Sequence, residues 1–433
     1  MKDSASVRAL TVALATLTAC MSASAESLPD AWQMGFARNM ELAAVVAETE
    51  SARANERAAR AERWPSLTAN AGYTRFDTAP QLDIAAGGLA LQAPIFPDET
   101  YASCSVQLKV PLYTGGRISA QIGAAHQEAL GADVSEAAAR SSLRLGIARA
   151  YVDVLRSRRL LEAAESSVAS LTAHASDVKL MVDRELVTRS DLLAAQVAMA
   201  NAEQLRVQTD NNVALAYAAY NRMLGEPIDR TPMLDDALPV ERQLGERALE
   251  ELTREAVQSR SELAALAARA ESLSLQSEAQ RALLLPQLAL SGGYDYFENE
   301  ILDRQGFGSV GIGVSWNVFD GGVVKNRAAA LERAGRAARH RLDDLRTQVQ
   351  LEVRQAWLDV RAAQARIVAS REAKSLAEEN LRMTRELYGG GLGTNTQVLD
   401  AVALQITAAN NHDNAVLDEA LALLALQRAV GKL

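Results

Sequence analysis

Two short stretches of the chain alternate between apolar and small or polar residues, which is the pattern of a β-strand with one apolar face. In the first stretch, the apolar positions are Val106, Leu108, Val110 and Leu112. In the second, they are Val310, Ile312, Val314 and Trp316. A soluble sandwich shares this pattern with a membrane-spanning strand. The signal peptide described below, and the lack of a second apolar partner surface, favour lipid on the apolar side.

Long helices are predicted for most of the remaining chain. Residues 117–185 and 322–388 would each form about 100 Å of α-helix. The other predicted helices are about half as long and cover residues 30–63, 190–224, 245–284 and 396–430. Two half-length helices laid end to end match one long helix, and the many alanine residues allow close coiled-coil packing. The pattern therefore predicts an elongated helical bundle with an irregular belt at residues 225–245.

The two halves of the chain repeat each other. Residues 28–76 align without gaps on residues 249–297 at an offset of 221 positions, and beyond them the offset is 206. At the second offset, Gly115-Gly116 matches Gly321-Gly322. The change of offset places an insertion in the first half, where the proline-containing residues 77–103 are predicted to form a long surface loop.

This repeat divides the chain into segments. A signal peptide at residues 1–25 precedes a first repeat, which consists of residues 26–225 with a helix, a β-hairpin at 65–114 and a long helical hairpin at 117–224. An equatorial linker covers residues 226–245. The second repeat consists of residues 246–433, with a helix, a β-hairpin at 286–320 and a helical hairpin at 322–430.

The N-terminus has the features of a secretory signal peptide, since Lys2 and Arg8 stand beside an apolar run at residues 9–19. Two cleavage sites compete, because a lipobox would leave a lipidated Cys20, whereas an A-x-A sequence ending at Ala25 would leave Glu26 first. If the first helix ends at the membrane, its start lies about 50 Å away. A chain from Cys20 extends at most about 35 Å, so the lengths favour cleavage after Ala25 over lipidation.

The predicted strands are too few to close a barrel. Each half supplies two strands of about ten residues, which cross a bilayer when tilted, and no later apolar run of about 18 residues predicts a transmembrane helix. An open edge in lipid leaves backbone groups unsatisfied, and single-chain barrels need about eight strands. The chain therefore has to share a barrel with copies of itself. Three copies would supply twelve strands, but the sequence leaves the number open.

Composition and charge exclude several functional classes. The chain has a formal net charge of −9, so it lacks the basic surface of a general nucleic-acid binder. Its 2 cysteines rule out a disulfide scaffold, and its 4 histidines have no i, i+4 spacing for zinc. The glycines at 306, 308 and 311 match a dinucleotide fingerprint, but they lead into a strand instead of a helix. We therefore predict no catalytic residues, no cofactor and no metal site.

The combined order of these segments resembles the TolC family of outer-membrane efflux proteins over essentially all of the mature chain. The resemblance rests on Leu285-Pro286-Gln287-Leu288 at the start of a strand, on the glycine pair before each long helix, and on the residues from Tyr388 to Ala401. It implies a mainly α-helical homotrimer, in which a shared twelve-stranded outer-membrane barrel continues into a periplasmic coiled-coil tunnel. It also implies docking to a periplasmic adaptor and an inner-membrane transporter, as the exit duct of a tripartite efflux or type I secretion system.

The same resemblance implies a gate at the periplasmic end. In the family, a tyrosine before the second helical turn and two aspartates after it constrict the entrance. Here Tyr388 occupies the tyrosine position and Asp400 the second aspartate position. Gln397 stands at the first aspartate position, and Gly393 stands where an arginine often holds the closed state. These departures imply a less acidic and less firmly closed constriction.

The two helical turns are predicted to contact the adaptor. Thr188 or Ser190, and Thr394 or Thr396, can cap the helices that follow the turns. The glycine-rich turn before Thr394 suits a tight reversal, and exposed apolar residues at such a tip would form a docking patch. The predicted docking residues are Leu186, Val187, Thr188, Ser190, Gly391, Leu392, Gly393 and Thr394.

Two other classes of protein share parts of this pattern. A periplasmic coiled-coil structural or adaptor-like protein, with no channel, would place the strand hairpins in a soluble domain. A general diffusion porin fits poorly, because porins are nearly all strand. The sequence does not identify the cargo, and drugs, metal ions and polypeptides all fit such a duct.

Overall fold

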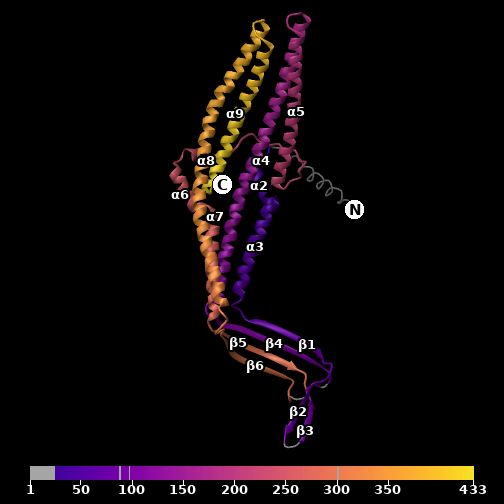
Figure 1. The fold of residues 1–433 in the computed structure, drawn as a ribbon, viewed down its shortest axis with the longest axis vertical. Coiled ribbons are helices and arrows are strands. Elements are labelled where there is room, and N and C mark those ends of the chain that lie inside the picture. Colours follow the sequence, from indigo (N-terminus) through magenta and orange to yellow (C-terminus); the bar gives the residue numbers. More distant parts are fainter. Residues whose placement is uncertain (1–24, 87–88, 97, 300–301) are drawn as a thin grey trace, which may run out of the picture. The chain divides into compact units, whose positions relative to one another are not determined.

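A computed structural model describes residues 25–86, 89–96, 98–299 and 302–433, most of which are helical (Figure 1). Residues 1–24, including Cys20 and the proposed lipobox, lie outside the described residues. Among the described helices, none is both long and apolar enough to span a bilayer.

The main sheet is antiparallel and has the order β1-β4-β5-β6. Its strands are β1 (Ser66–Arg75), β4 (Thr100–Tyr113), β5 (Gln287–Phe297) and β6 (Gly306–Ser315). Leu67 pairs with Leu108, and Leu288 pairs with Val314, so the two hairpins have the same register under the repeat offsets. The twofold repeat of the sequence is therefore also a repeat of strand pairing.

This register places most of the two predicted apolar series on one face of the sheet. Val110 pairs with Leu290, which pairs in turn with Ile312, and successive side chains on one strand point to opposite faces. Val310 is 84% exposed and Ile312 is 66% exposed, so this apolar face is uncovered in the single chain. Two members depart from the regular pattern: Leu112 lies at a register shift, and Trp316 follows the end of β6.

The segment predicted as a long surface loop is partly a second sheet, which corrects the prediction. The strands β2 (Gln81–Ala86) and β3 (Leu89–Pro94) pair antiparallel, and β4 already begins at Thr100. Phe96 packs against Tyr101 with ring centroids 4.5 Å apart, and it also contacts Phe76 and Phe297. The prolines of this segment favoured a loop, and its few β-branched residues gave little indication of strands.

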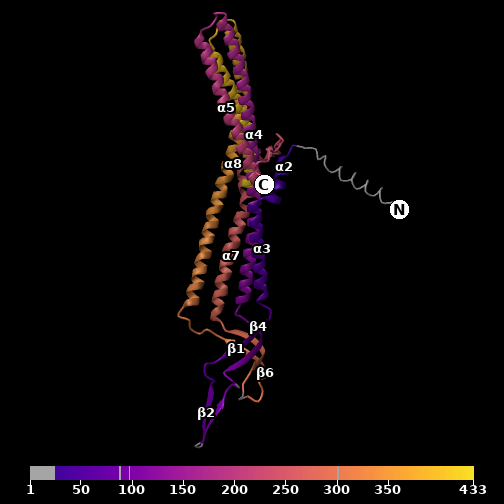
Figure 2. The same ribbon diagram turned by 90° about the vertical axis from the view of Figure 1, so that its right-hand side faces the viewer.

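The helical hairpins have the lengths that the sequence predicts. The helices α4 (Arg117–Asp183) and α8 (Val323–Gly389) each contain 67 residues. The helices α5 (Arg189–Leu224) and α9 (Asn395–Val430) each contain 36 residues. α4 and α5 lie side by side from their shared turn (Figures 1 and 2).

The helix preceding each strand hairpin is broken, where the sequence predicts one continuous helix. The first is divided into α2 (Leu28–Arg38) and α3 (Met40–Ala61), and the second into α6 (Leu249–Ser259) and α7 (Ser261–Arg281). Asn39 and Arg260, at the two breaks, occupy equivalent repeat positions and have ψ angles of 120° and 118°. The predicted helices at 30–63 and 245–284 are therefore wrong in their continuity.

Contacts from the other end of each repeat explain the two breaks. The Asn39 amide donates to the Met223 carbonyl oxygen (2.9 Å), and the Arg260 guanidinium donates to the Ala429 carbonyl oxygen (3.2 Å). These carbonyl groups lie at equivalent positions near the ends of α5 and α9. Each breaking residue thus satisfies a carbonyl group that a helix end leaves without a partner.

Contacts divide the chain into two units, and each contains residues of both repeats. One unit includes residues 25–46, 136–261 and 345–433, and its core is centred on large buried side chains. These include Leu28, Ile147, Tyr151, Leu155, Tyr220, Leu224, Leu417 and Leu424. The other unit, residues 47–135 and 262–344, contains the sheets and a smaller cluster of Ala270, Leu273 and Ala338.

Candidate functional site

The turns of the two helical hairpins have the same backbone. Glu185 and Gly391 occupy equivalent positions in the left-handed region, with φ angles of 59° and 74°. The Leu186 N–H donates to the Met181 carbonyl oxygen (2.9 Å). In the second turn, the Leu392 N–H donates to the Leu387 carbonyl oxygen (2.8 Å). This is the Schellman arrangement that satisfies the last carbonyl groups of a helix. A tight reversal was predicted only for the glycine-rich turn, because glutamate rarely adopts the positive φ that Glu185 has.

Each turn is followed by a capping box at the start of the next helix. Thr188 caps α5 with Asp191, and Thr394 caps α9 with Gln397, so the structure selects these two threonines among the predicted caps. The side-chain oxygen of Gln397 accepts from the Thr394 N–H (2.8 Å). Gln397, one of the three predicted gate residues, is therefore engaged in the cap of its own helix.

The predicted docking residues lie together at the turns, and the leucines are the most prominent of them. Leu186 is 68% exposed and Leu392 is 82% exposed. Ser190 is also exposed, whereas Val187 and Gly393 are half-buried. A Cβ at Gly393 would lie 3.1 Å from the backbone nitrogen of Tyr388, so any side chain at this position would crowd the turn.

Tyr388 is buried in the interior of the tip and is only 9% exposed. It packs with Ala175, Val178, Ala195 and Val398. Its hydroxyl group is buried and has no hydrogen-bond partner within the described ranges. Burial raises the pKa of this phenol, and the negative charge of Asp191 adds to the effect.

The three predicted gate residues have different surroundings in the single chain. Tyr388 is buried, Gln397 belongs to a helix cap, and Asp400 is exposed on α9. One chain alone does not bring them into a single cluster.

A buried polar chain that the sequence analysis missed joins the two hairpins. His174 on α4 lies with its Nε2 2.7 Å from Oδ1 of Asn395, and the Asn395 side-chain amide donates to the Asp191 carbonyl oxygen (3.0 Å). His174 is 7% exposed and Asn395 is 3% exposed. Because the Asn395 oxygen is the acceptor, Nε2 of His174 carries the proton. We call His174, Asn395 and the Asp191 carbonyl group the tip clasp.

The clasp could not be read from composition, because a histidine and an asparagine are common surface residues. The available signal was position: Asn395 follows a glycine-rich turn directly, and His174 falls on the apolar side of α4.

A groove of about 790 Å³ lies beside the tip clasp. Its walls include His174 and Asp177 of α4, Arg385 and Tyr388 of α8, and Ile406 of α9. The Arg385 guanidinium of α8 donates to the Ser170 hydroxyl of α4 (2.5 Å), which adds a second polar link between the two hairpins. Within the described part of the chain, no group of three His, Cys, Asp or Glu side chains is placed to hold a metal ion.

Long helical hairpins with matched turns, joined to a four-stranded sheet with one uncovered apolar face, define a class of outer-membrane channel proteins. The chain belongs to the outer membrane efflux protein family, which it matches over residues 33–226 and 252–432. The predicted family and fold class are confirmed.

Relatives and solved structures agree with this assignment. The outer membrane protein TolC of Vibrio cholerae serotype O1 is 25% identical over 440 residues, which cover 98% of this chain and 94% of the relative. The structure of VceC from Vibrio cholerae has a TM-score of 0.78 at 20% identity and covers 93% of this chain and 96% of VceC. An open state of the MtrE outer membrane channel of Neisseria gonorrhoeae has a TM-score of 0.75 at 19% identity, covering 93% and 88%.

The chain is thus an outer-membrane efflux protein, and the predicted location in the outer membrane is confirmed. The family and these relatives are channel proteins, not enzymes.

Proposed function

We propose that three copies of this chain form the channel, each contributing β1, β4, β5 and β6 to one twelve-stranded barrel. The edge strands β1 and β6 each leave one row of backbone groups unpaired in the single chain. Unpaired backbone groups in lipid are costly, and a closed barrel removes both edges. The face of Val106, Leu108, Val310 and Ile312 then contacts outer-membrane lipid.

The periplasmic entrance of this channel lies at the turns α4–α5 and α8–α9. The tip clasp is the observation that carries this assignment, because a buried polar chain resists separation of the two hairpins. Each removed partner leaves a buried donor or acceptor unsatisfied, at a cost of about 1–3 kcal/mol. The clasp therefore favours a closed entrance, and separation of the hairpins opens it.

A periplasmic adaptor, which couples the channel to an inner-membrane transporter, docks on the exposed Leu186 and Leu392. These leucines are within a few residues of Asp191 and Asn395, so a partner bound there acts directly on the clasp. Exposed apolar groups at a rigid turn suit recognition by an apolar patch of a partner.

The assembly is tested by native mass spectrometry of protein extracted in detergent from outer membranes, together with conductance in planar bilayers. A trimer that conducts ions supports the shared barrel. A monomer, or protein recovered from the soluble periplasm, contradicts it.

The docking surface is tested with Leu186→Asp and Leu392→Asp, which place a charge on each turn without touching buried residues. We expect both variants to assemble as channels but to lose adaptor cross-linking and transporter-dependent efflux. Leu205→Asp is the matched control, because Leu205 is an exposed leucine of α5 away from the turn. Efflux that is equal in the tip variants and the control would exclude the turns as the docking surface.

A further inference from the structure

Glu26 is held by its backbone before the first helix begins. Its N–H donates to the Met233 carbonyl oxygen (2.7 Å), and its own carbonyl group accepts from the Asp235 N–H (3.0 Å). The Tyr151 hydroxyl lies 2.8 Å from the same carbonyl oxygen and 2.6 Å from that of Asp235, so its one proton is shared between these two acceptors. Residue 26 is therefore fixed against the linker at residues 226–245, whereas its predecessor Ala25 is exposed.

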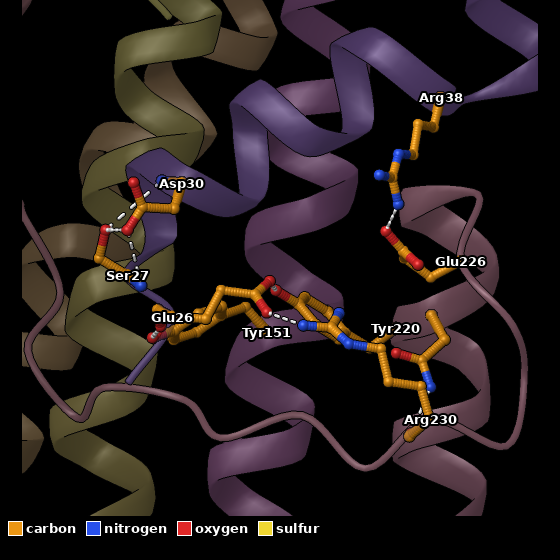
Figure 3. Close-up of polar contacts among 9 residues, drawn as sticks. Glu26, Ser27, Asp30, Arg38, Tyr151, Tyr220, Glu226 and Arg230 are labelled. Carbon is orange, nitrogen blue, oxygen red and sulfur yellow. Dashed lines mark hydrogen bonds and ion pairs between the residues drawn. The ribbon is translucent and has the colours of Figure 1, made fainter. Parts of the chain in front are cut away.

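The side chain of Glu26 is also fully engaged (Figure 3). Its carboxylate accepts from the hydroxyl of Tyr220 and from the Arg230 guanidinium, the latter at 2.7 Å. The side chain is 9% exposed. A carboxylate this deeply buried requires paired donors, and Tyr220 and Arg230 supply them. Together with Tyr151, which contacts the Glu26 backbone carbonyl oxygen, these residues form a socket around Glu26.

The charges around this socket do not balance. Burial raises the pKa of the Tyr151 hydroxyl, and the negative charges of three carboxylates, those of Asp235, Glu26 and Asp236, add to the effect. Arg230 pairs with Glu26, and Arg159 lies 4.0 Å from Asp236. The Asp235 carboxylate accepts the N–H of Ala237 (3.1 Å) but has no salt bridge in the described residues. The socket thus has one more negative than positive group.

We infer that this cluster is a seat for a processed N-terminus, created by cleavage between Ala25 and Glu26. Water adds across the peptide bond at a signal peptidase, so that Ala25 leaves with a carboxylate and the Glu26 nitrogen takes up protons as an α-ammonium group. The ammonium group keeps the donor to Met233 and supplies the missing positive charge. The small residues Ala23 and Ala25 meet the sequence requirement for such cleavage.

The second repeat provides an internal comparison. Arg247 is the counterpart of Glu26, and its carbonyl oxygen accepts from the Trp357 indole N–H (3.2 Å), as that of Glu26 does from Tyr151. At Arg247 the chain is continuous, and the residue itself brings a positive charge, which pairs with Glu255 (3.0 Å). Of these two counterparts, only Glu26 is negative, and only Glu26 follows the cleavage sequence. There the terminal ammonium group adds the positive charge that Arg247 supplies with its own side chain.

The first experiment is intact-mass spectrometry of the full-length gene product extracted from outer membranes. We expect the mass of a chain that starts at Glu26 and has no acyl group. The Cys20→Ser variant should have the same mass, because residue 20 is removed with the signal peptide. A start at any other residue, or an acylated Cys20, overturns the inference.

The second experiment measures the pKa of the α-amino group, by the pH dependence of its reductive dimethylation followed by mass spectrometry. A free α-amino group titrates at about 7.7–8.0, and the seat should raise this value by about 1 unit. Asp235→Asn keeps the acceptor for Ala237 but removes a charge, so it should lower the value again.

Glu226→Gln is the matched control, because it removes a carboxylate that pairs with Arg38 in the same belt but outside the seat (Figure 3). We expect it to leave the α-amino pKa unchanged. A value in the ordinary range for the unmodified protein, or equal values for Asp235→Asn and the unmodified protein, would overturn the seat even if the chain starts at Glu26.

Discussion

The tip clasp consists of two buried side chains whose polar atoms satisfy each other. His174 corresponds by repeat position to Asn380, and Asn395 corresponds to Arg189. Neither counterpart is buried. The clasp therefore has no copy under the repeat, and it joins Asn395 of α9 to both helices of the first hairpin, α4 and α5.

Replacing Asn395 with alanine should weaken the closed entrance. The change leaves Nε2 of His174 and the Asp191 carbonyl group without their partner, a loss of about 1–3 kcal/mol. The ratio of open to closed channels should rise by roughly 5- to 150-fold. Single-channel recording in planar bilayers measures this ratio.

Asn380→Ala is the control for that measurement, because Asn380 is exposed on α8 and lies outside the clasp. Its open probability should equal that of the unmodified channel. If both variants conduct alike, the clasp does not hold the entrance closed.

Glu185 occupies a backbone conformation that suits glycine, and Gly391 shows the preferred solution at the equivalent position. Glu185→Gly should therefore stabilise the protein by about 1 kcal/mol, and Gly391→Ala should destabilise it by about the same amount. The midpoint of urea unfolding in detergent reports both changes. Shifts in the same direction for the two variants would refute the argument from φ.

At the scale of elements, the hydrophobic pattern predicts the lengths of α4, α5, α8 and α9, because each is set by local periodicity and by turn residues. It does not predict the breaks at Asn39 and Arg260. Those breaks depend on carbonyl groups of Met223 and Ala429, which are far away in sequence. A local pattern contains no information about such partners.

Gly225, at the end of α5, lies directly against the first break, at the end of α2. It ends α5 with a φ of 74°, and a Cβ there would collide with the Arg38 backbone at the end of α2. Gly225→Ala should therefore lower the free energy of unfolding by clearly more than the roughly 1 kcal/mol of backbone strain alone.

Gly321→Ala separates the two contributions, because Gly321 has a φ of 65° but open space around its Cβ position. This variant should lose only about 1 kcal/mol in the same urea titration. Equal losses for the two variants would show that contact with Arg38 contributes nothing.

At the scale of the whole molecule, the sequence was sufficient for the repeat, the fold class and the family, since these depend on periodicities that extend over hundreds of residues. Less of the candidate site could be predicted from the sequence. The exposed leucines of the turns were predicted, but the burial of Tyr388 depends on packing of α8 against α4, α5 and α9. The cap formed by Gln397 is local, because Thr394-x-x-Gln397 is a capping-box pattern within the sequence itself.

The proposed trimer predicts a strand register between chains. The pairing of β6 with β1 of the next copy should repeat the pairing of β4 with β5 within one chain. Lys109 of β4 pairs with Ser291 of β5. The repeat offsets convert this pair to Ser315 of β6 and Asn70 of β1 in the next copy. Ser315→Cys combined with Asn70→Cys, in a Cys104→Ser background, should form disulfide-linked trimers under mild oxidation.

Ser315→Cys combined with Thr68→Cys is the control pair, since it is displaced by two residues along β1. It should cross-link much less, as judged by non-reducing gel electrophoresis. Cross-linking of the control pair alone would assign a different register to the seam.

The matched registers of the two strand hairpins have an evolutionary consequence. In the proposed trimer, duplication of the gene for one half turns six identical modules into three pairs, and only then can the two modules of a pair diverge. The two halves differ near their turns, where one half contributes His174 and the other contributes Tyr388 and Asn395, which contact it. In an ancestral ring of six equal halves, every turn would have had the same residues, so a contact between two unlike hairpins could not have formed.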